Sequence, residues 1–95
     1  MNSINDFIKD NGLKVDCHVT GEIYFCNINS KDGEYQFSMT REKLIEHMRR
    51  FASKNFAEAM IKDERWVMTH FRRIALYWWH IQVSSTKLSK ELNID

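Results

Sequence analysis

The chain has 95 residues, a formal net charge of +1, and 43% hydrophobic and 28% charged residues. This length predicts a single domain (1–95) with a modest core, and the composition is that of an ordinary globular protein. The small net charge excludes a strong overall attraction to nucleic acid or membranes. The apolar run at 74–79 is far too short to span a bilayer, so no membrane role is expected.

The first predicted element is a short helix within residues 3–12. Ser3 and Asp6 have the spacing of a capping box, and Asn11-Gly12 is a helix-stop signal. Three apolar residues would give this helix one buried face: Ile4, Phe7 and Ile8.

Three strands are predicted next. Residues 13–20 alternate between apolar and polar side chains, which is typical of a half-buried strand. After a turn at Gly21, residues 22–29 are rich in β-branched and aromatic residues. Asp32-Gly33 marks a second turn, and residues 34–39 alternate again. Short turns between consecutive strands predict an antiparallel meander.

The rest of the chain is predicted to be helical, because residues 34–95 contain no Pro and no Gly. Thr40 is the expected N-cap of a helix whose apolar positions recur with a 3.6-residue period from Leu44 to Met60. A corner at 62–65 precedes a second helix. Its expected core face consists of Val67, Phe71, Ile74, Ala75, Trp78 and Ile81.

The tail at 84–93 could add a short helix of its own, with Leu88 and Leu92 four residues apart. The predicted fold is therefore α+β, in the order α-β-β-β-α-α with an optional short C-terminal helix. It divides into a first half at 1–39 and a helical half at 40–95. The first half holds six acids and three bases (−3), and the helical half seven acids and eleven bases (+4).

No motif points to a catalytic or metal site. Cys17 and His18 are adjacent on a predicted strand, so they face opposite ways, and Cys26 completes no zinc-ligand spacing. His47, His70 and His80 show no recognisable arrangement with a nucleophile and a carboxylate. A non-enzymatic protein without cofactor or metal is expected. With only two cysteines and no signal-peptide pattern, we expect reduced thiols and a cytoplasmic location.

The strongest functional signal is a set of aromatic and basic residues in the helical half. Trp, Tyr and Arg dominate binding hot spots, and the same residues suit single-stranded nucleic acid. The alternatives are a protein-binding surface, a nucleic-acid surface, a solvated face, and a homodimer interface through the helix at 66–83. The candidate binding residues are Trp66, Arg72, Arg73, Tyr77 and Trp79, with Arg49 and Arg50 in support.

Three segments resemble small phage anti-CRISPR proteins, which inhibit Cas nucleases: residues 1–8, the turn and strand at 29–35, and the helix that follows. The order α-β-β-β-α-α is also similar to one such inhibitor. That inhibitor is strongly acidic and mimics nucleic acid, whereas the helical half here is basic. The resemblance therefore implies inhibition through a helical contact surface.

We expect a small phage or mobile-element protein that blocks a larger host protein in the host cytoplasm. The target would be a Cas effector or another defence or nucleic-acid-handling protein. The alternative is a nucleic-acid-binding regulatory module that uses Arg and Lys together with stacking Trp and Tyr.

Overall fold

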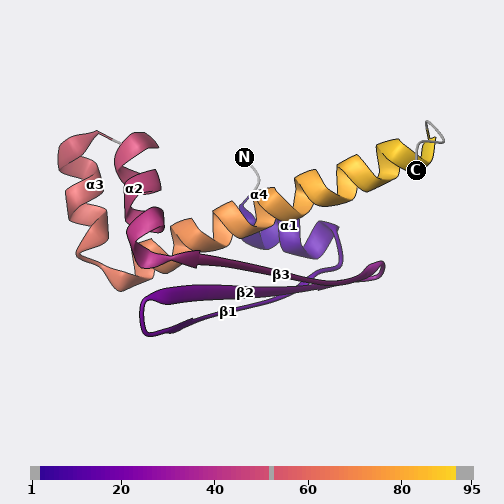
Figure 1. The fold of residues 1–95 in the computed structure, drawn as a ribbon, viewed down its shortest axis with the longest axis horizontal. Coiled ribbons are helices and arrows are strands. Elements are labelled where there is room, and N and C mark those ends of the chain that lie inside the picture. The colour runs from indigo at the N-terminus through magenta and orange to yellow at the C-terminus, as the bar shows by residue number, and fades with distance from the viewer. Residues whose placement is uncertain (1–2, 52, 92–95) are drawn as a thin grey trace.

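The computed structural model describes residues 3–51 and 53–91, and it is an α+β fold with one three-stranded antiparallel sheet, as the sequence predicts. In Figure 1, α4 runs along the sheet, while α2 and α3 stand together at one end. The elements in order are α1 (Ile4–Asp10), β1 (Lys14–Thr20), β2 (Ile23–Ser30), β3 (Gly33–Thr40), α2 (Arg41–Phe51), α3 (Lys54–Ile61) and α4 (Glu64–Glu91).

The short helix α1 forms where its signals predict. The Ser3 hydroxyl accepts a hydrogen bond from the Asp6 backbone N–H, and the Asp6 carboxylate accepts one from the Ser3 backbone N–H. Asn11 is the C-cap, and Gly12 follows with a φ of 62°. Because glycine has no Cβ, it adopts this left-handed conformation without strain and turns the chain into β1.

The strands pair in the order β1-β2-β3, which confirms the meander. In the central strand β2, Tyr24, Cys26 and Ile28 are buried under the helices, and the residues between them are more exposed. The register places Cys17 of β1 directly opposite Cys26. One face of the sheet therefore packs against the core. The other face is mostly polar but carries Phe25, whose ring stacks on that of His18.

The single helix predicted from Leu44 to Met60 is wrong, because the structure has two helices there. Ser53 adopts an extended conformation (φ −62°, ψ 151°), and its hydroxyl accepts a hydrogen bond from the Phe56 N–H as the N-cap of α3. The break keeps the apolar period nearly in phase, so the pattern alone does not reveal it. The predicted cap at Thr40 is confirmed, since its hydroxyl accepts from the Lys43 N–H at 3.3 Å.

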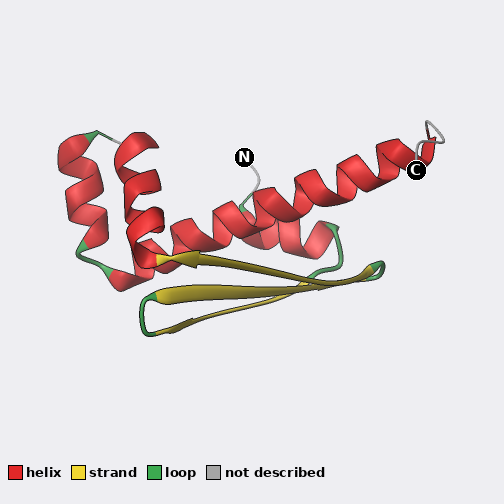
Figure 2. Cartoon of the chain, in the orientation of Figure 1, coloured by secondary structure: helices red, strands yellow, loops and turns green. Residues whose placement is uncertain are grey.

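The separate tail helix is also wrong. After the predicted corner, α4 continues without interruption to Glu91 and extends past the end of the sheet (Figure 2). The side chain of Leu88, and Leu92 with Asn93, fall outside what the structure describes.

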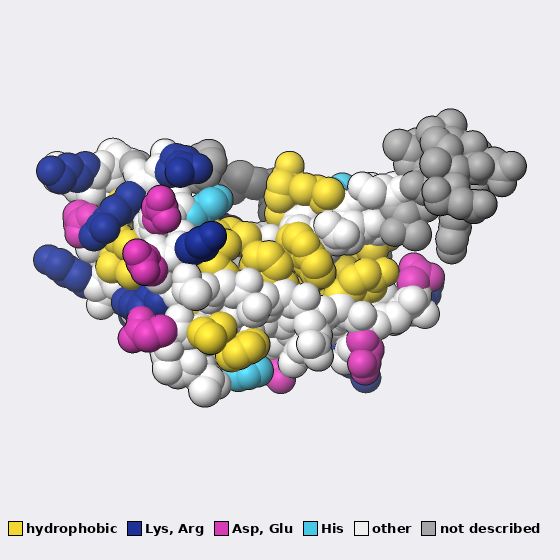
Figure 3. Space-filling view, in the orientation of Figure 1, with side chains coloured by type: hydrophobic (Ala, Val, Ile, Leu, Met, Phe, Trp, Pro, Cys, Tyr) yellow, Lys and Arg dark blue, Asp and Glu magenta, His cyan; other side chains and the backbone are white. Residues whose placement is uncertain are grey.

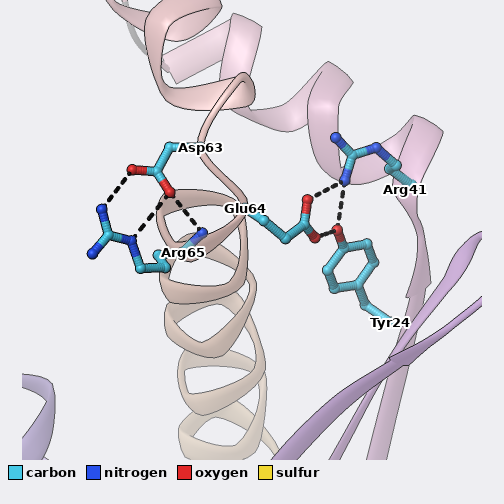
Figure 4. Close-up of polar contacts among 5 residues, drawn as sticks. All are labelled: Tyr24, Arg41, Asp63, Glu64 and Arg65. Atoms are coloured by element: carbon cyan, nitrogen blue, oxygen red, sulfur yellow. Dashed lines mark hydrogen bonds and ion pairs between the residues drawn. The ribbon is translucent and has the colours of Figure 1, made fainter.

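A polar triad fixes the start of α4 against the sheet and α2 (Figure 4). The Tyr24 hydroxyl donates to Oε1 of Glu64. Arg41 donates to the Tyr24 oxygen at 2.6 Å and to Oε2 of Glu64 at 3.0 Å. Burial, together with the Glu64 carboxylate, raises the pKa of Tyr24 to about 12. This triad joins three elements at one point.

The core centres on Phe71 of α4, whose ring lies 5.4 Å from that of Tyr24 and 5.8 Å from that of Phe37. The predicted core face of α4 is wrong in part. Ile81 is 41% exposed, whereas Trp79 is only 5% exposed. Trp79 is buried because α1 covers it, and the Phe7 ring packs edge-on against its indole at 6.0 Å.

Candidate functional site

The outward side of α4 carries one continuous row of large polar and aromatic side chains, which we call the α4 stripe. Its members are spaced four, three, four and three residues apart, so they share one face of a helix with about 3.6 residues per turn. This face is opposite the buried positions Phe71 and Ala75. The stripe consists of Trp66, His70, Arg73, Tyr77 and His80.

Two aromatic rings of the stripe are largely exposed to solvent. Trp66 is 50% exposed and Tyr77 is 68% exposed. They are eleven residues apart, which corresponds to about 16 Å along the helix axis. Arg73 lies between them and is exposed. Two aromatic anchors flanking an arginine have the composition of a protein-binding hot spot.

A groove of about 310 Å³ opens beside the stripe, between α1 and α4. Its walls are mostly apolar, and Arg73 and His80 supply polar edges. The Phe7 ring meets the His80 ring edge-on, with centroids 6.2 Å apart. The groove is lined by Ser3, Ile4, Phe7, Arg73, Leu76, Tyr77 and His80. Its size and lining suit an inserted apolar side chain with a polar group beside it.

His47 of α2 reaches His70 of the stripe. Nδ1 of His47 and Nε2 of His70 are 3.0 Å apart. Burial lowers the pKa of both rings, and the positive charges of Arg50 near His47 and of Arg73 near His70 lower them further. Both histidines are therefore held neutral at pH 7, so one ring can donate its N–H to the other.

The sequence does not reveal that His47 and His70 are in contact. Each histidine lies at the polar edge of its helix, and 23 residues separate them. The only available signal is that both lie in helical segments whose polar edges can meet. Their contact depends on how α2 crosses α4, which the periodicity of either helix does not specify.

The structure brings together only part of the predicted binding set. Trp66, Arg73 and Tyr77 share the α4 stripe. Arg50 lies outside the stripe, but its positive charge is close enough to His47 to lower the pKa of that ring. His47 in turn contacts His70 of the stripe. Three predicted residues lie elsewhere, for different reasons.

Trp79 is the clearest correction, because it is a core residue and not an uncovered ring. Its indole N–H has no hydrogen-bond partner among the described residues. Arg72 lies near the sheet, close enough to Cys17 to lower the pKa of its thiol. Arg49 donates to the Glu58 carboxylate at 2.9 Å.

Positive charge gathers at one end of the molecule. Figure 3 shows Lys and Arg side chains over α2 and α3, with acidic groups among them, and hydrophobic groups along α4. Ion pairs neutralise part of this charge. Besides the Arg49–Glu58 pair, Arg41 lies 3.0 Å from Glu64 and Arg65 lies 3.2 Å from Asp63 (Figure 4).

The Arg65 pair also caps α4. Asp63 accepts hydrogen bonds from the Arg65 guanidinium and from its backbone N–H, and these bonds lower the pKa of Asp63. This arginine is therefore engaged by its own helix N-terminus rather than free to form a cationic patch.

Within residues 3–51 and 53–91, no group of three or more His, Cys, Asp or Glu side chains is placed to hold a metal ion. In the same part of the chain, no helix is both long and apolar enough to cross a membrane.

Comparison with protein-family models, with curated proteins and with solved structures finds no match for this chain. Function is therefore inferred from the side chains and their geometry.

Proposed function

We propose that the chain is a small binding protein that occupies a surface of a larger protein through the α4 stripe and the adjoining groove. One observation supports this most directly: Trp66 and Tyr77 remain 50% and 68% exposed on the same helix face whose reverse side supplies the core. An exposed aromatic residue is common, but two on one row beside an apolar groove favour a partner.

The stripe also limits the chemistry of that partner. Two apolar hollows about 16 Å apart would receive the rings. A carboxylate or a cluster of carbonyl oxygens between them would accept hydrogen bonds from Arg73. A bound partner would remove water from Arg73, and burying this charge without a partner is costly. A partner that presented only apolar surface to Arg73 would therefore bind poorly.

We further propose that the protein is of phage or mobile-element origin and that the partner is a host defence or nucleic-acid-handling protein, such as a Cas effector. The resemblance of the N-terminal and turn segments to anti-CRISPR proteins supports this choice. Inhibition would follow from steric occupation of the partner's surface, because the stripe lacks the acidic character needed to mimic nucleic acid.

A nucleic-acid-binding role is the second candidate, supported by basic side chains beside exposed rings. The ion pairs of Arg41, Arg49 and Arg65 weaken it, since each carboxylate offsets charge that phosphates would need. It predicts retardation of single-stranded nucleic acid at low salt, with affinity that falls steeply as salt increases.

The test is capture from a host lysate, followed by binding and nuclease-inhibition assays with the purified captured protein. The variant Trp66→Ala/Tyr77→Ala should lose at least tenfold in affinity, because hot-spot truncations cost about 2 kcal/mol or more. Phe56→Ala is the matched control: Phe56 is 59% exposed but belongs to α3, away from the stripe.

Equal capture by the stripe variant and the wild type would refute this surface. The molecular mass of the protein in solution tests whether the stripe instead mediates a homodimer. A wild-type dimer that becomes monomeric in the stripe variant would show that the α4 stripe binds a second copy of the chain rather than a host protein.

A further inference from the structure

The two cysteines form a facing pair, although nine residues separate them in the chain. Cys17 and Cys26 are register partners on β1 and β2, and their sulfur atoms are 3.1 Å apart. Facing residues of an antiparallel pair have Cα atoms about 4.5–5.5 Å apart, which falls within the range that a disulfide spans. Both thiols are free.

The surroundings of the two thiols differ. Cys26 is buried in the core on the central strand, whereas Cys17 is half-buried on the edge strand β1. Arg72 of α4 lies close enough to Cys17 for its positive charge to favour a thiolate, and the negative charge of Asp16 of β1 opposes this effect. Cys17 is thus the accessible thiol beside a cation, and Cys26 is the inaccessible thiol behind it.

These contacts favour a thiolate on Cys17. The hydrogen bond between the two thiols lowers the pKa of Cys17, burial opposes this change, and Arg72 lowers the pKa further. For Cys26, the bond to Cys17 and burial both raise the pKa. A thiolate, not a thiol, attacks disulfides. The same arrangement of an activated and a resolving cysteine is found in redox-sensitive dithiols.

We propose that Cys17 and Cys26 are a modification site for thiol–disulfide exchange, which takes low-molecular-weight disulfides of the glutathione type. The Cys17 thiolate attacks one sulfur of the disulfide, forms a mixed disulfide and releases one glutathione thiolate. Cys26 then loses its proton to that thiolate and attacks the Cys17 sulfur, which releases the second glutathione. The second glutathione thiolate takes up from water the proton that Cys17 had released to it, so two protein thiols and one glutathione disulfide yield one protein disulfide and two glutathione thiols.

The product is a disulfide bond between Cys17 on the edge strand β1 and Cys26 on the central strand β2. The sulfurs need to approach by only about 1 Å to reach bonding distance, so the hairpin keeps its register. Oxidation removes the anion next to Arg72 on the sheet-facing side of α4. The site is separate from the α4 stripe, and its chemistry does not depend on the proposed partner.

Intact-mass measurement after incubation with oxidised glutathione tests the site in the full chain. The wild type should lose two hydrogens, and a peptide map should show Cys17 joined to Cys26. Cys26→Ser should stop at one glutathione on Cys17, and Cys17→Ser should remain unmodified. A folded wild type that stays reduced, or that forms only disulfides between molecules, would overturn the proposal.

The role of Arg72 is measured separately, by the rate at which iodoacetamide alkylates Cys17 at neutral pH in the Cys26→Ser background. Arg72→Gln should slow this reaction by about three- to tenfold, since it removes a cation that favours the thiolate. Arg65→Gln is the matched control, on the same helix but exposed and paired with Asp63. Equal rates in the Arg72 and Arg65 variants would exclude Arg72 from the mechanism.

Discussion

The two sides of α4 use the same kinds of residue for opposite purposes. On the inner side, Trp79 is 5% exposed and packs on Phe7, and on the outer side Trp66 is 50% exposed. Neither the residue type nor the local helix distinguishes the two rings. The difference is what lies opposite each position: a sheet and α1 on one side, and solvent on the other.

This contrast shows that an aromatic-rich helix can supply both a core and a binding surface, provided that its orientation about its own axis is fixed relative to the sheet. Here the rotation is fixed at one end by the triad of Tyr24, Arg41 and Glu64, and in the middle by the packing of Phe71. Because the α4 stripe and the core residues lie on opposite faces, only a rotation of α4 by about half a turn about its axis would bury the stripe and expose the core rings. Four variants, each compared with a control or with the wild type, test how this arrangement is held.

The largest expected effect is that of Phe71→Ala on the inner side. It removes a fully buried ring between Tyr24 and Phe37 and leaves a cavity, so the free energy of unfolding should fall by about 3–5 kcal/mol. Urea denaturation followed by circular dichroism measures this loss. Trp66→Ala on the outer side should cost less than about 1 kcal/mol. Similar costs for both variants would contradict the division into core and surface.

The second effect is that of Tyr24→Phe, which removes the hydroxyl shared by Glu64 and Arg41. Hydrogen bonds to charged groups contribute about 1.5–3 kcal/mol, and we expect a loss of this size, with Tyr77→Phe near zero as control. Because the pKa of Tyr24 is raised to about 12, folding disfavours its ionised form. The wild type should therefore lose stability as pH rises above the ordinary tyrosine value of about 10, and Tyr24→Phe should lose less.

The third effect is that of Ser53→Ala at the start of α3. The hydroxyl satisfies the Phe56 N–H, and loss of an N-cap costs about 1 kcal/mol. Ser84→Ala, at an exposed position within α4, is the control and should be nearly neutral. If both serines behave alike in thermal denaturation, the cap does not define the corner between α2 and α3.

The smallest effect concerns His47 and His70, at the edge of the α4 stripe. Their pKa values are lowered on folding, so the unfolded chain takes up protons first as pH falls. Stability contributed by the neutral pair is fully present above about pH 6.5 and decreases below it. His47→Gln/His70→Gln should flatten the dependence of the unfolding free energy on pH between neutral and acidic conditions. An unchanged profile would show that the pair does not respond to pH.

Local sequence signals predicted the helix caps and turns well at positions where a single residue type determines the backbone conformation. The capping box at Ser3 and Asp6, the turn at Asp32-Gly33 and the cap at Thr40 all lie where expected. The break at Ser53 was missed, because a serine inside a periodic apolar pattern is compatible with both a continuous helix and a new N-cap.

The binding residues were predicted in part. Trp66, Arg73 and Tyr77 share one exposed face, and helical spacing alone puts them there. Trp79 and Arg72 were expected beside them and face inward instead. The contact of His47 with His70 depends on how α2 crosses α4, so no local pattern could reveal it. The contact of Cys17 with Cys26 depends on the register of the β1–β2 hairpin, which the length of its turn sets.

The sequence by itself determined the three-stranded meander, the helical half and the presence of more aromatic rings on α4 than one core face needs. Alternation and helical period encode these features locally. Only the tertiary structure decided which rings are covered. The reason is physical: the sheet, α1 and the Tyr24–Arg41–Glu64 triad together set the rotation of α4, and a helix carries no information in its own period about what packs against it.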